Sequence, residues 1–351
     1  MQQKLLEILR CPVTRSKLKL QVIKDVPRQF GDTMITTVEE GILFADEHWF
    51  YPIVKGIPRL CAESFLDHVD FLKTNMKDYE GRKTNLQSRY SDVLQYVLKK
   101  NKRTKDSFNK EWSVYNYEKD KTWNAGDEEM LNRFLTETGE SMESIKSKAI
   151  FDAGCGNGKL NCLLAEKGIF NIAMDLSTSI EFPASKTNSA NVHFIQGDVQ
   201  FPPVAFNYFD IVHSSGVLIH TNNTELSFSC LVPALKNGGK LSVWLYHPRN
   251  NFLHRLFNSV RTVTSELPLG LQYYLYLVTI FPLGYCIKKL KGNPQNAREM
   301  MVDILDWFTP EFRWEHGHEE AASWFYKRQF KKVKVTTDGV FGFNIIGEKE
   351  Y

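Results

Sequence analysis

The chain of 351 residues is longer than one compact core usually organises, and 42% of it is hydrophobic, which predicts a globular protein of two domains. A net charge of +3 is too small to indicate a nucleic-acid-binding protein. The six cysteines are scattered and form no CxxC pair, which argues against a disulfide framework and favours a reducing compartment. We therefore expect a cytoplasmic protein.

Residues 1–62 predict a small α+β domain. An amphipathic start, MQQKLLEILRCPV, lacks the continuous apolar segment and the small-residue cleavage site of a secretory signal peptide. Strand-like alternation follows in KLKLQVI and MITTVEEGILF, and the unit closes on WFYPIVKGIPRLC.

Residues 63–104 predict a charged helical linker that ends in the basic run KKNKRTK. We expect this run to form a solvated helix face, with a phosphate-binding patch as the alternative. Just beyond it, Phe108 and Trp112 lie one helical turn apart. Such a pair is expected to be core, although it could instead cover a bound cofactor.

Strands and helices alternate over residues 105–351. Five strands are predicted in AIFDA, FNIAMDL, VHFIQGD, FDIVHSSG and GKLSVWLY, and Gly238 and Gly239 are expected to end the helix before the fifth. Two final strands, KKVKVTTD and FGFNIIGEK, are expected to form a hairpin that puts one antiparallel strand at the edge. This order predicts an α/β fold with a doubly wound, mostly parallel seven-stranded sheet and an antiparallel C-terminal hairpin.

An apolar insertion at about residues 249–300 separates the fifth strand from the last helix. Residues 267–287 carry no charge and reach the length of a membrane span, which is about 20 residues. Two prolines interrupt them, however, and the chain must return to complete its sheet, so we expect no span. The alternatives are a helical lid over the active site, a peripheral membrane contact through residues 267–291, and a homodimer interface. All three favour an apolar or amphipathic substrate.

Three glycines follow the first strand of the predicted sheet, in AIFDAGCGNGKL. They place bare backbone and a helix N-terminus at the carboxyl ends of the strands, where doubly wound sheets bind ligands. Asp175 lies 21 residues after Gly154, a spacing typical of an acidic residue that binds a ribose diol. A dinucleotide site would show G-x-G-x-x-G, whereas this chain has G-x-G-x-G preceded by Asp152. A carboxylate there disfavours a pyrophosphate and favours a cationic nucleoside such as S-adenosylmethionine.

Five separated motifs resemble those of class I S-adenosylmethionine-dependent methyltransferases in order and spacing. They are FDAGCGNG, MDLS, the Gly197-Asp198 pair, FDIVHSSGVLIHT and LKNGGKLSVW. The resemblance covers about residues 105–351 and implies S-adenosyl-L-methionine as the cofactor, with the glycines under its methionine part and Asp175 on its ribose. The cofactor-binding residues that it implies are Asp152, Gly154, Cys155, Gly156, Asn157, Gly158, Asp175, Leu176, Gly197, Asp198, Val199, Ser214 and Gly216.

The N-terminal unit resembles the small zinc-ribbon subunit that activates several RNA and release-factor methyltransferases. The resemblance lies in LLEILRCPVTRSKLKL and WFYPIVKGIPRL. Only Cys11 remains of the expected CxxC pairs, because Thr14 stands at its partner position and ADEHW replaces the second pair, which leaves His48 as a further candidate ligand. Two ligands cannot complete a structural zinc tetrahedron, so we expect a degenerate domain without metal. It would pack on the catalytic domain, extend its substrate cleft, or remain as a stabilising remnant.

Methyl transfer depends chiefly on alignment, and a general base is needed only where the acceptor loses a proton. His220 follows the fourth strand in GVLIHT, and His247 follows the fifth in WLYHPRN. Asp306 and His316 lie in DWFTPEFRWEHGH, which resembles a segment that returns toward the cleft in one bacterial subgroup. These four are the candidate catalytic residues. The alternatives are that His220 holds its loop or caps a helix, and that His316 caps the helix after it.

These features predict a methyltransferase that acts on a small molecule or glycoconjugate precursor, with oxygen as the favoured atom. The main alternative is an RNA or protein methyltransferase that docks its substrate on the N-terminal domain. The small net charge argues against it, and so does SSGV after the fourth strand, where enzymes acting on planar nitrogen carry an Asn-Pro-Pro-Tyr type motif. We therefore expect no stable nucleic-acid complex. A third alternative is a partner protein that binds the cofactor without turnover.

Overall fold

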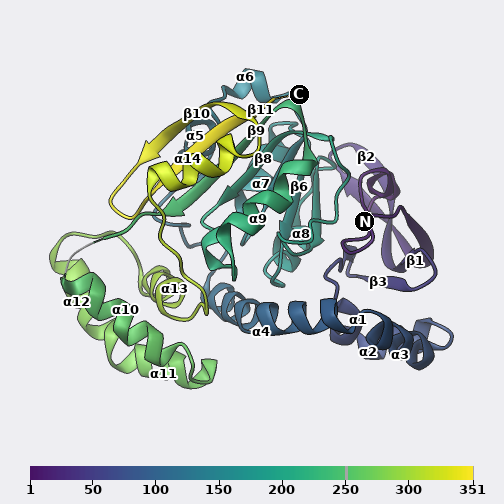
Figure 1. Cartoon of the computed structure of the whole chain (residues 1–351), viewed down its shortest axis with the longest axis horizontal. Helices are drawn as coiled ribbons and strands as arrows, with labels where there is room; N and C mark the ends of the chain where they lie inside the picture. The colour runs from purple at the N-terminus through teal and green to yellow at the C-terminus, as the bar shows by residue number, and fades with distance from the viewer. Residues whose placement is uncertain (250–251, 351) are drawn as a thin grey trace.

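A seven-stranded sheet forms the centre of the computed structural model, which describes residues 1–249 and 252–350 (Figure 1). Its strand order is β10-β11-β9-β8-β5-β6-β7. The strands are β5 (Ile150–Ala153), β6 (Asn171–Asp175), β7 (Val192–Gln196), β8 (Phe209–Ser215), β9 (Leu235–Tyr246), β10 (Phe330–Asp338) and β11 (Gly342–Lys349). Strands β5 to β9 pair in parallel, whereas β11 is antiparallel to both β9 and β10. The predicted fold class is confirmed, but the antiparallel strand lies inside the sheet, with β10 at the edge.

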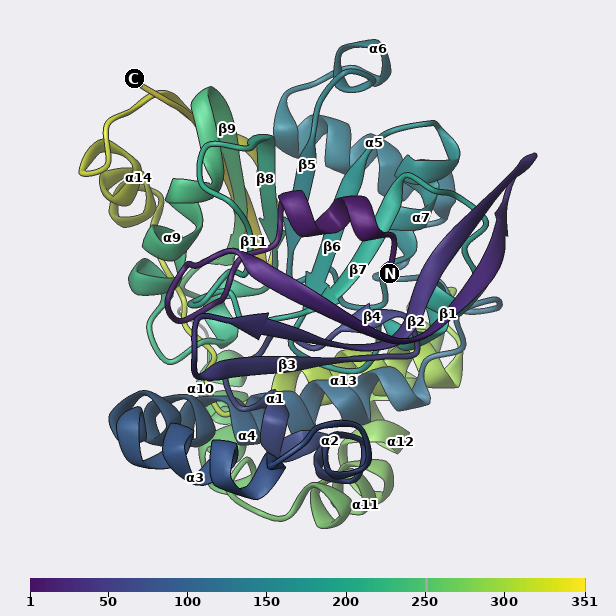
Figure 2. The ribbon, with the colours of Figure 1, turned by 90° about the vertical axis from the view of Figure 1, so that its right-hand side faces the viewer.

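Helices cover both faces of this sheet, because central strands such as β5 and β6 are buried on both sides. Figure 2 shows α5 and α7 on one face and α9 and α14 on the other. The helices of this part are α5 (Asp127–Thr138), α6 (Met142–Ile145), α7 (Lys159–Glu166), α8 (Glu181–Lys186), α9 (Thr224–Leu231) and α14 (His318–Tyr326), with the 3-10 turns η2 (Leu218–His220) and η3 (Val232–Ala234).

The helix before β9 ends earlier than predicted. After α9, η3 leads directly into β9, so Gly238 and Gly239 lie within the strand and do not terminate a helix. Gly238 has a φ of +74°, and the register of β9 against β8 shifts at this point. Gly238 thus supplies the left-handed backbone of a bulge in β9, and not the end of a helix.

The N-terminal residues form a separate antiparallel sheet of order β1-β2-β3-β4 that packs beside β7. Its elements are η1 (Gln3–Glu7), β1 (Leu18–Phe30), β2 (Thr33–Ala45), β3 (Trp49–Val54) and β4 (Ile57–Pro58). The Leu60 N–H donates to the Gln196 carbonyl at 2.8 Å, and the fully buried Arg59 donates to Glu181 at 2.7 Å. One hydrophobic core joins this unit to the central sheet.

Cys11, the remaining predicted zinc-ligand position, has protein partners. Its Sγ lies 3.2 Å from the Tyr51 Oη and accepts the Thr14 N–H at 3.4 Å. Within residues 1–249 and 252–350, no three or more His, Cys, Asp or Glu side chains are grouped as a metal site would require.

A long helix, α4, crosses the domain boundary predicted at residues 104/105. It follows three shorter helices and runs beneath the carboxyl ends of the central strands (Figures 1 and 2). These helices are α1 (Ser64–Asp67), α2 (Val69–Asn75), α3 (Tyr79–Arg89) and α4 (Ser91–Val114). The basic run is not simply a solvated face, because Lys100 is buried in an ion pair with Asp198, and Lys105 pairs with Asp67 at 2.6 Å.

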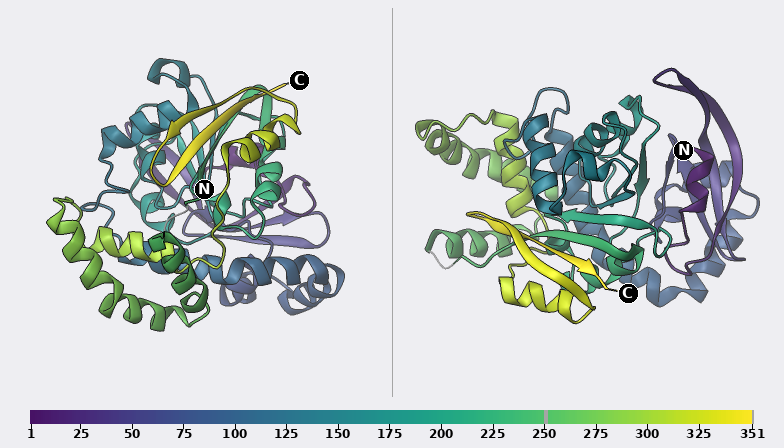
Figure 3. Two further views of the ribbon diagram at one scale, coloured as in Figure 1. Left: turned by 60° about the vertical axis from the view of Figure 1, so that its left-hand side comes forward. Right: turned by 90° about the horizontal axis from the view of Figure 1, so that it is seen from above.

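The insertion folds into helices at the end of the molecule opposite the β1–β2 hairpin (Figure 3). They are α10 (Phe252–Thr264), α11 (Leu269–Val278), α12 (Ile280–Leu290) and α13 (Ala297–Phe308); residues 250–251 of the predicted insertion lie outside the described residues. Helix α13 packs against α4, and its buried side chains share a cluster with Tyr276 of α11. No single described helix has the length and apolarity of a membrane span, although α11 and α12, bent by 45°, reach them as a pair.

Candidate active site

A cavity of about 1120 Å³ lies at the carboxyl ends of β5 to β9. Loops after these strands form one wall, and α4, α13 and the β10–β11 turn form the others. Pockets for one small ligand usually have about 300–1,000 Å³, so this cavity has room for a nucleoside cofactor together with an acceptor.

The glycines after β5 adopt backbone angles that other residues rarely reach. Gly154 and Gly156 have φ values of +97° and +56°. A Cβ at Gly154 would collide with Val217, and one at Gly156 would lie 2.8 Å from the Trp112 ring. These glycines therefore let the turn pack against protein side chains as well as face the cavity.

The carboxylate of Asp175 is fixed against this loop by hydrogen bonds. Its Oδ2 accepts the Gly156 N–H at 2.8 Å, and its Oδ1 accepts the Ser177 N–H at 2.8 Å and the Ser177 hydroxyl at 2.6 Å. Burial raises the pKa of Asp175, and these hydrogen bonds oppose the rise. The side chain is thus held in one orientation at the end of β6.

Asp198, after β7, is held by two residues of α4. It forms an ion pair with Lys100 and accepts the Asn101 amide at 3.1 Å, while the Gln200 N–H donates to its other oxygen at 2.9 Å. The sequence interpretation missed this contribution of α4. The signal was available: Thr104, Phe108 and Glu111 follow at helical spacing and line the same cavity.

The structure brings most of the predicted site residues together. Those that line the cavity are Gly154, Cys155, Gly156, Asn157, Asp175, Leu176, Gly197, Asp198, Val199, Gly216, His220 and Asp306. Phe108 and Trp112, expected to be core, also line it. The predicted residues outside the lining are Asp152, Gly158, Ser214, His247 and His316.

Asp152 is paired inside the protein. His213 on β8 lies between two carboxylates, with Nδ1 at 3.0 Å from Asp152 and Nε2 at 2.9 Å from Glu137. Burial lowers the pKa of His213, but the hydrogen bonds to both carboxylates outweigh it and raise the pKa to about 10. The resulting imidazolium offsets one of the two negative charges, and Asp152 is bonded to it outside the cavity lining, so Asp152 gives no direct support to the argument for a cationic ligand.

The other four residues outside the lining also have partners elsewhere. Gly158 packs against Phe194, and the Ser214 hydroxyl donates to the Ala153 carbonyl at 2.7 Å. The His247 ring donates to the Gly339 carbonyl at 2.8 Å. His316 bonds Glu320 and Thr224 through its two ring nitrogens, at 2.9 and 3.0 Å. These contacts stabilise the loops after the strands and helix α14.

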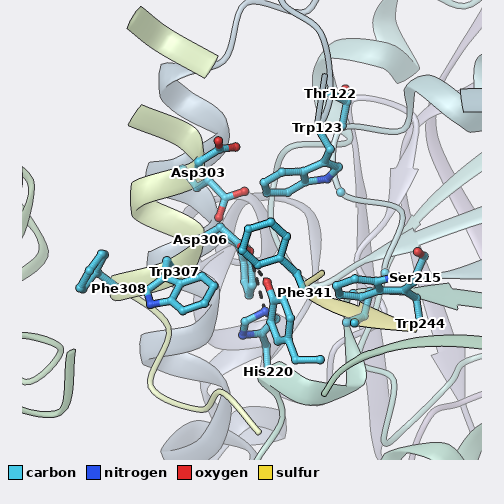
Figure 4. Close-up of a pocket in the computed structure, with 18 of the residues that line it drawn as sticks. Thr122, Trp123, Ser215, His220, Trp244, Asp303, Asp306, Trp307, Phe308 and Phe341 are labelled. Carbon is cyan, nitrogen blue, oxygen red and sulfur yellow. Dashed lines mark hydrogen bonds and ion pairs between the residues drawn. The ribbon is translucent and has the colours of Figure 1, made fainter. Parts of the chain in front are cut away.

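His220 and Asp306 meet inside the cavity (Figure 4). The His220 Nδ1 donates to the Phe312 carbonyl at 3.0 Å, and Nε2 lies 3.7 Å from the Asp306 Oδ1 without a hydrogen-bond partner among the described residues. Tyr246 donates to the Asp306 Oδ2 at 2.8 Å. Burial lowers the pKa of His220 to about 3 and raises that of Asp306 to about 6. His220 is therefore a neutral imidazole whose Nε2 lone pair lies beside the Asp306 carboxyl in the cavity wall.

Glu111 on α4 is a further buried acid that the sequence interpretation missed. It is fully buried in the cavity wall, and neither oxygen has a hydrogen-bond partner in the described parts of the chain. Burial, followed by the nearby charges of Asp306 and Asp175, raises its pKa well above the usual value. Burial therefore favours the neutral form of the Glu111 carboxyl, and a cation close to it would favour the charged form.

Aromatic side chains enclose the space around His220 and Asp306. Trp307 of α13 and Phe341 of the β10–β11 turn border this space, and Trp123 and Trp244 lie on another side of it (Figure 4). Trp123 has a φ of +52°, a backbone angle that costs a non-glycine residue energy and is common at functional sites. The acceptor side of the cavity is thus suited to a flat apolar ligand.

Comparisons with known proteins match parts of the chain to methyltransferases. A family described as "Methyltransferase domain" matches residues 151–243. The demethylmenaquinone methyltransferase of Renibacterium salmoninarum is 28% identical over 127 residues, which are 36% of this chain and 51%, about half, of that protein. The ubiquinone biosynthesis O-methyltransferase of Coxiella burnetii is 24% identical over 49% of this chain and 81% of its own length.

Among solved structures, the chain is similar to magnesium protoporphyrin IX methyltransferase from Synechocystis with bound SAH. The identity is 15%, the TM-score is 0.39, and the match covers 70% of this chain and 98% of that one. The family match shows a methyltransferase domain over residues 151–243 of the chain.

Proposed function

We propose that the protein is an O-methyltransferase whose acceptor is a small apolar molecule with a hydroxyl group. The observation that carries the proposal is the unpartnered Nε2 of His220 beside Asp306, in an aromatic part of the cavity. A hydroxyl is a poor nucleophile until it loses its proton, and this pair is placed to take it.

The tautomer of His220 follows from its partner. A backbone carbonyl can only accept, so Nδ1 carries the proton and Nε2 is the basic atom. The bound cofactor supplies a methyl group on a positively charged sulfur. When the acceptor oxygen bonds the methyl group, the carbon–sulfur bond would break and leave a neutral thioether. The hydroxyl proton would pass to Nε2, so that the positive charge would end on the imidazole. The carboxylate of Asp306, 3.7 Å away, stabilises the imidazolium.

The cofactor is proposed to bind along the loops after β5, β6 and β7. Gly154 and Gly156 would face its methionine part, Asp175 its ribose, and Asp198 with Val199 its adenine. Support for a cation comes from Glu111, whose buried and unpartnered carboxyl would become charged beside it. Glu111 therefore takes the place of Asp152 as the negative charge that would favour a cationic ligand.

An apolar acceptor is supported by the aromatic lining and by the two relatives. One relative is named for demethylmenaquinone and the other for ubiquinone biosynthesis. Trp123, Trp307 and Phe341 offer flat surfaces for a ring-shaped acceptor of this kind.

For the N-terminal unit we propose a structural role as a degenerate relative of the zinc-ribbon activator. It binds the β7 edge through Arg59 and Leu60, and α1 to α3 connect it to α4, which carries Lys100 and Glu111. The unit would therefore hold α4 in place above the cavity.

The test is incubation of the full chain with methyl-labelled S-adenosylmethionine and a fractionated cell extract. We expect the label in an organic-soluble small molecule, in a form stable to mild alkali as an ether is. A reaction without extract and one with the Asp175→Ala variant serve as controls. Label found in RNA or protein, or label released by alkali as from an ester, would contradict the proposal.

A further inference from the structure

The helices α10, α11 and α12 each expose a stripe of large apolar side chains. The three residues of each stripe are three, four, seven or eleven positions apart, so they share one face of their helix, and Phe257 of α10 is exposed beside its stripe. The stripes consist of Phe252, Leu256 and Val263 on α10, Leu271, Tyr274 and Val278 on α11, and Leu283, Ile287 and Leu290 on α12. Leu290 is 89% exposed and Phe252 is 79% exposed.

The same helices are apolar on their inner side as well. Tyr276 of α11 and Ile280 of α12 belong to the cluster around α13. Helix α11 contains no charged residue, although it lies on the surface. A surface helix of a globular protein normally turns a charged or polar face outward, so these three helices are incompletely covered.

The charge of this segment is strongly one-sided. Residues 249–296 contain one acidic residue, Glu266, and six basic ones: Arg249, Arg255, Arg261, Lys288, Lys289 and Lys291. The three lysines lie at or just after the end of α12, next to the exposed Leu290. Lys288 pairs with Asp303, which leaves the charges of Lys289 and Lys291 for a ligand. Apolar stripes with basic residues at their ends are typical of helices that lie in the interface of an anionic bilayer.

We propose that α10, α11 and α12 form a docking surface for an anionic lipid bilayer, with the exposed stripes in the interface and the lysines at the head groups. A second copy of the chain is a poorer occupant, because a two-fold contact would bring two identical basic segments together.

The docking surface and the cavity share a wall. Phe252 and Phe257 of α10 and Ile280 and Gly284 of α12 line the cavity, and Phe252 is at the same time among the most exposed residues of the surface. An acceptor dissolved in the bilayer would therefore enter between these helices. This last step rests on the proposed function, whereas the docking itself does not.

The test is co-sedimentation of the full chain with vesicles, without cofactor or acceptor. We expect binding to vesicles of phosphatidylcholine with phosphatidylglycerol, weaker binding to phosphatidylcholine alone, and a loss of affinity at high salt. The double variant Leu283→Glu/Leu290→Glu should weaken binding at least about tenfold. Met34→Glu, at an exposed apolar position of the distant β1–β2 hairpin, is the matched control and should bind as the wild type does.

Cys286 allows a second measurement, because it is exposed on α12 between Leu283 and Leu290. An environment-sensitive dye on this thiol should shift to the blue when anionic vesicles are added, and Cys286→Ser should abolish the shift. The proposal is wrong if the wild type does not bind, if the double variant binds equally well, or if the dye stays in water. It is also wrong if light scattering shows a dimer that the double variant converts to a monomer without any vesicle binding. Because no methyl transfer is measured, these results are independent of the proposed activity.

Discussion

The two ends of the cavity differ in how their polar groups are satisfied. At the end formed by β5, β6 and β7, the carboxylates of Asp175 and Asp198 accept several protein hydrogen bonds. Toward the other end, the His220 Nε2 is buried without a partner among the described residues, and so is Glu111, which is affected by the charges of both Asp175 and Asp306. Buried polar atoms are usually paired, so the first end is organised before any ligand arrives, and the second has bonding capacity left for one. This contrast is what one expects of a preformed cofactor site beside an acceptor site.

The largest expected effect concerns the acceptor end. Replacing Asp306 by Asn keeps the shape and the bond from Tyr246 but removes the charge that stabilises the imidazolium. We expect kcat to fall by about 10²–10⁴-fold, the range of general acid–base contributions, with cofactor affinity unchanged. Because the pKa of Asp306 is about 6 and the carboxylate is the active form, the wild-type rate should rise with pH through about 6. The variant should lack this rise.

Asp303→Asn is the matched control for that experiment. Asp303 lies one turn away on α13 and also lines the cavity, but its carboxylate is already paired with Lys288 at 2.8 Å. We expect less than about a tenfold change in kcat, in line with a half-buried ion pair. Equal effects of the two substitutions would mean that Asp306 has no special role.

The second largest effect concerns the free energy of unfolding, through the buried group of His213, Asp152 and Glu137. His213→Gln leaves Asp152 and Glu137 buried without a cation, and breaking such a pair costs about 3–5 kcal/mol of unfolding free energy. The folded pKa of His213 is about 10, above its ordinary 6.5, so its contribution is complete below pH 6.5 and lost as the pH rises toward 10. Urea unfolding from pH 6 to 10 should show this decline for the wild type and a flatter profile for the variant.

A second buried histidine tests the sign of this argument. The pKa of His193 is lowered to about 3 by burial, so its contribution to stability should rise with pH between about 3 and 6.5. His193→Gln should therefore alter only the acid limb. If both variants altered the same pH range, the ion-pair explanation for His213 would fail.

The third effect concerns the affinity for the cofactor, and it tests the end of the cavity formed by β5, β6 and β7 by itself. Asp175→Ala removes the acceptor of the Gly156 N–H and the proposed ribose ligand, and hydrogen bonds to charged groups contribute about 1.5–3 kcal/mol each. We expect titration calorimetry to show at least about tenfold weaker binding of both S-adenosylmethionine and S-adenosylhomocysteine. Asp25→Ala, at an exposed position on β1, should bind as the wild type does. Unchanged affinity of the Asp175 variant would remove the basis of the cofactor assignment.

The same contrast explains what could be predicted from the sequence. The glycine loop, Asp175 and Asp198 are positioned by their own strands, so a local pattern places them. His220 and Asp306 could be proposed because each follows a recognisable segment, but their meeting depends on where α13 packs. The sequence did not predict the partners of Asp152, because His213 is 61 residues away on a neighbouring strand.

Helix α4 shows the limit of periodicity. Its spacing predicts a buried face but does not say that the face lies on a cavity rather than on a core. The spacing therefore predicts that Phe108 and Trp112 are core, and it assigns no role to Glu111 between them. A buried carboxyl becomes informative only when its lack of partners is seen, which requires the tertiary structure.

The smallest expected effect decides to which end Glu111 belongs. Burial raises the pKa of Glu111 and so favours its neutral form in the free protein, whereas a nearby cation would favour the charged form. Binding of S-adenosylmethionine should then release up to about one proton, seen as a dependence of the binding enthalpy on the buffer's ionisation enthalpy. Glu111→Gln should abolish this proton release. It should also reduce the preference for S-adenosylmethionine over S-adenosylhomocysteine, which lacks the sulfonium charge. We expect this reduction to be about tenfold or less, since one pKa unit corresponds to about tenfold. If proton release and preference persist while only kcat and its pH profile change, Glu111 acts with Asp306 at the acceptor end, and the counter-charge role is wrong.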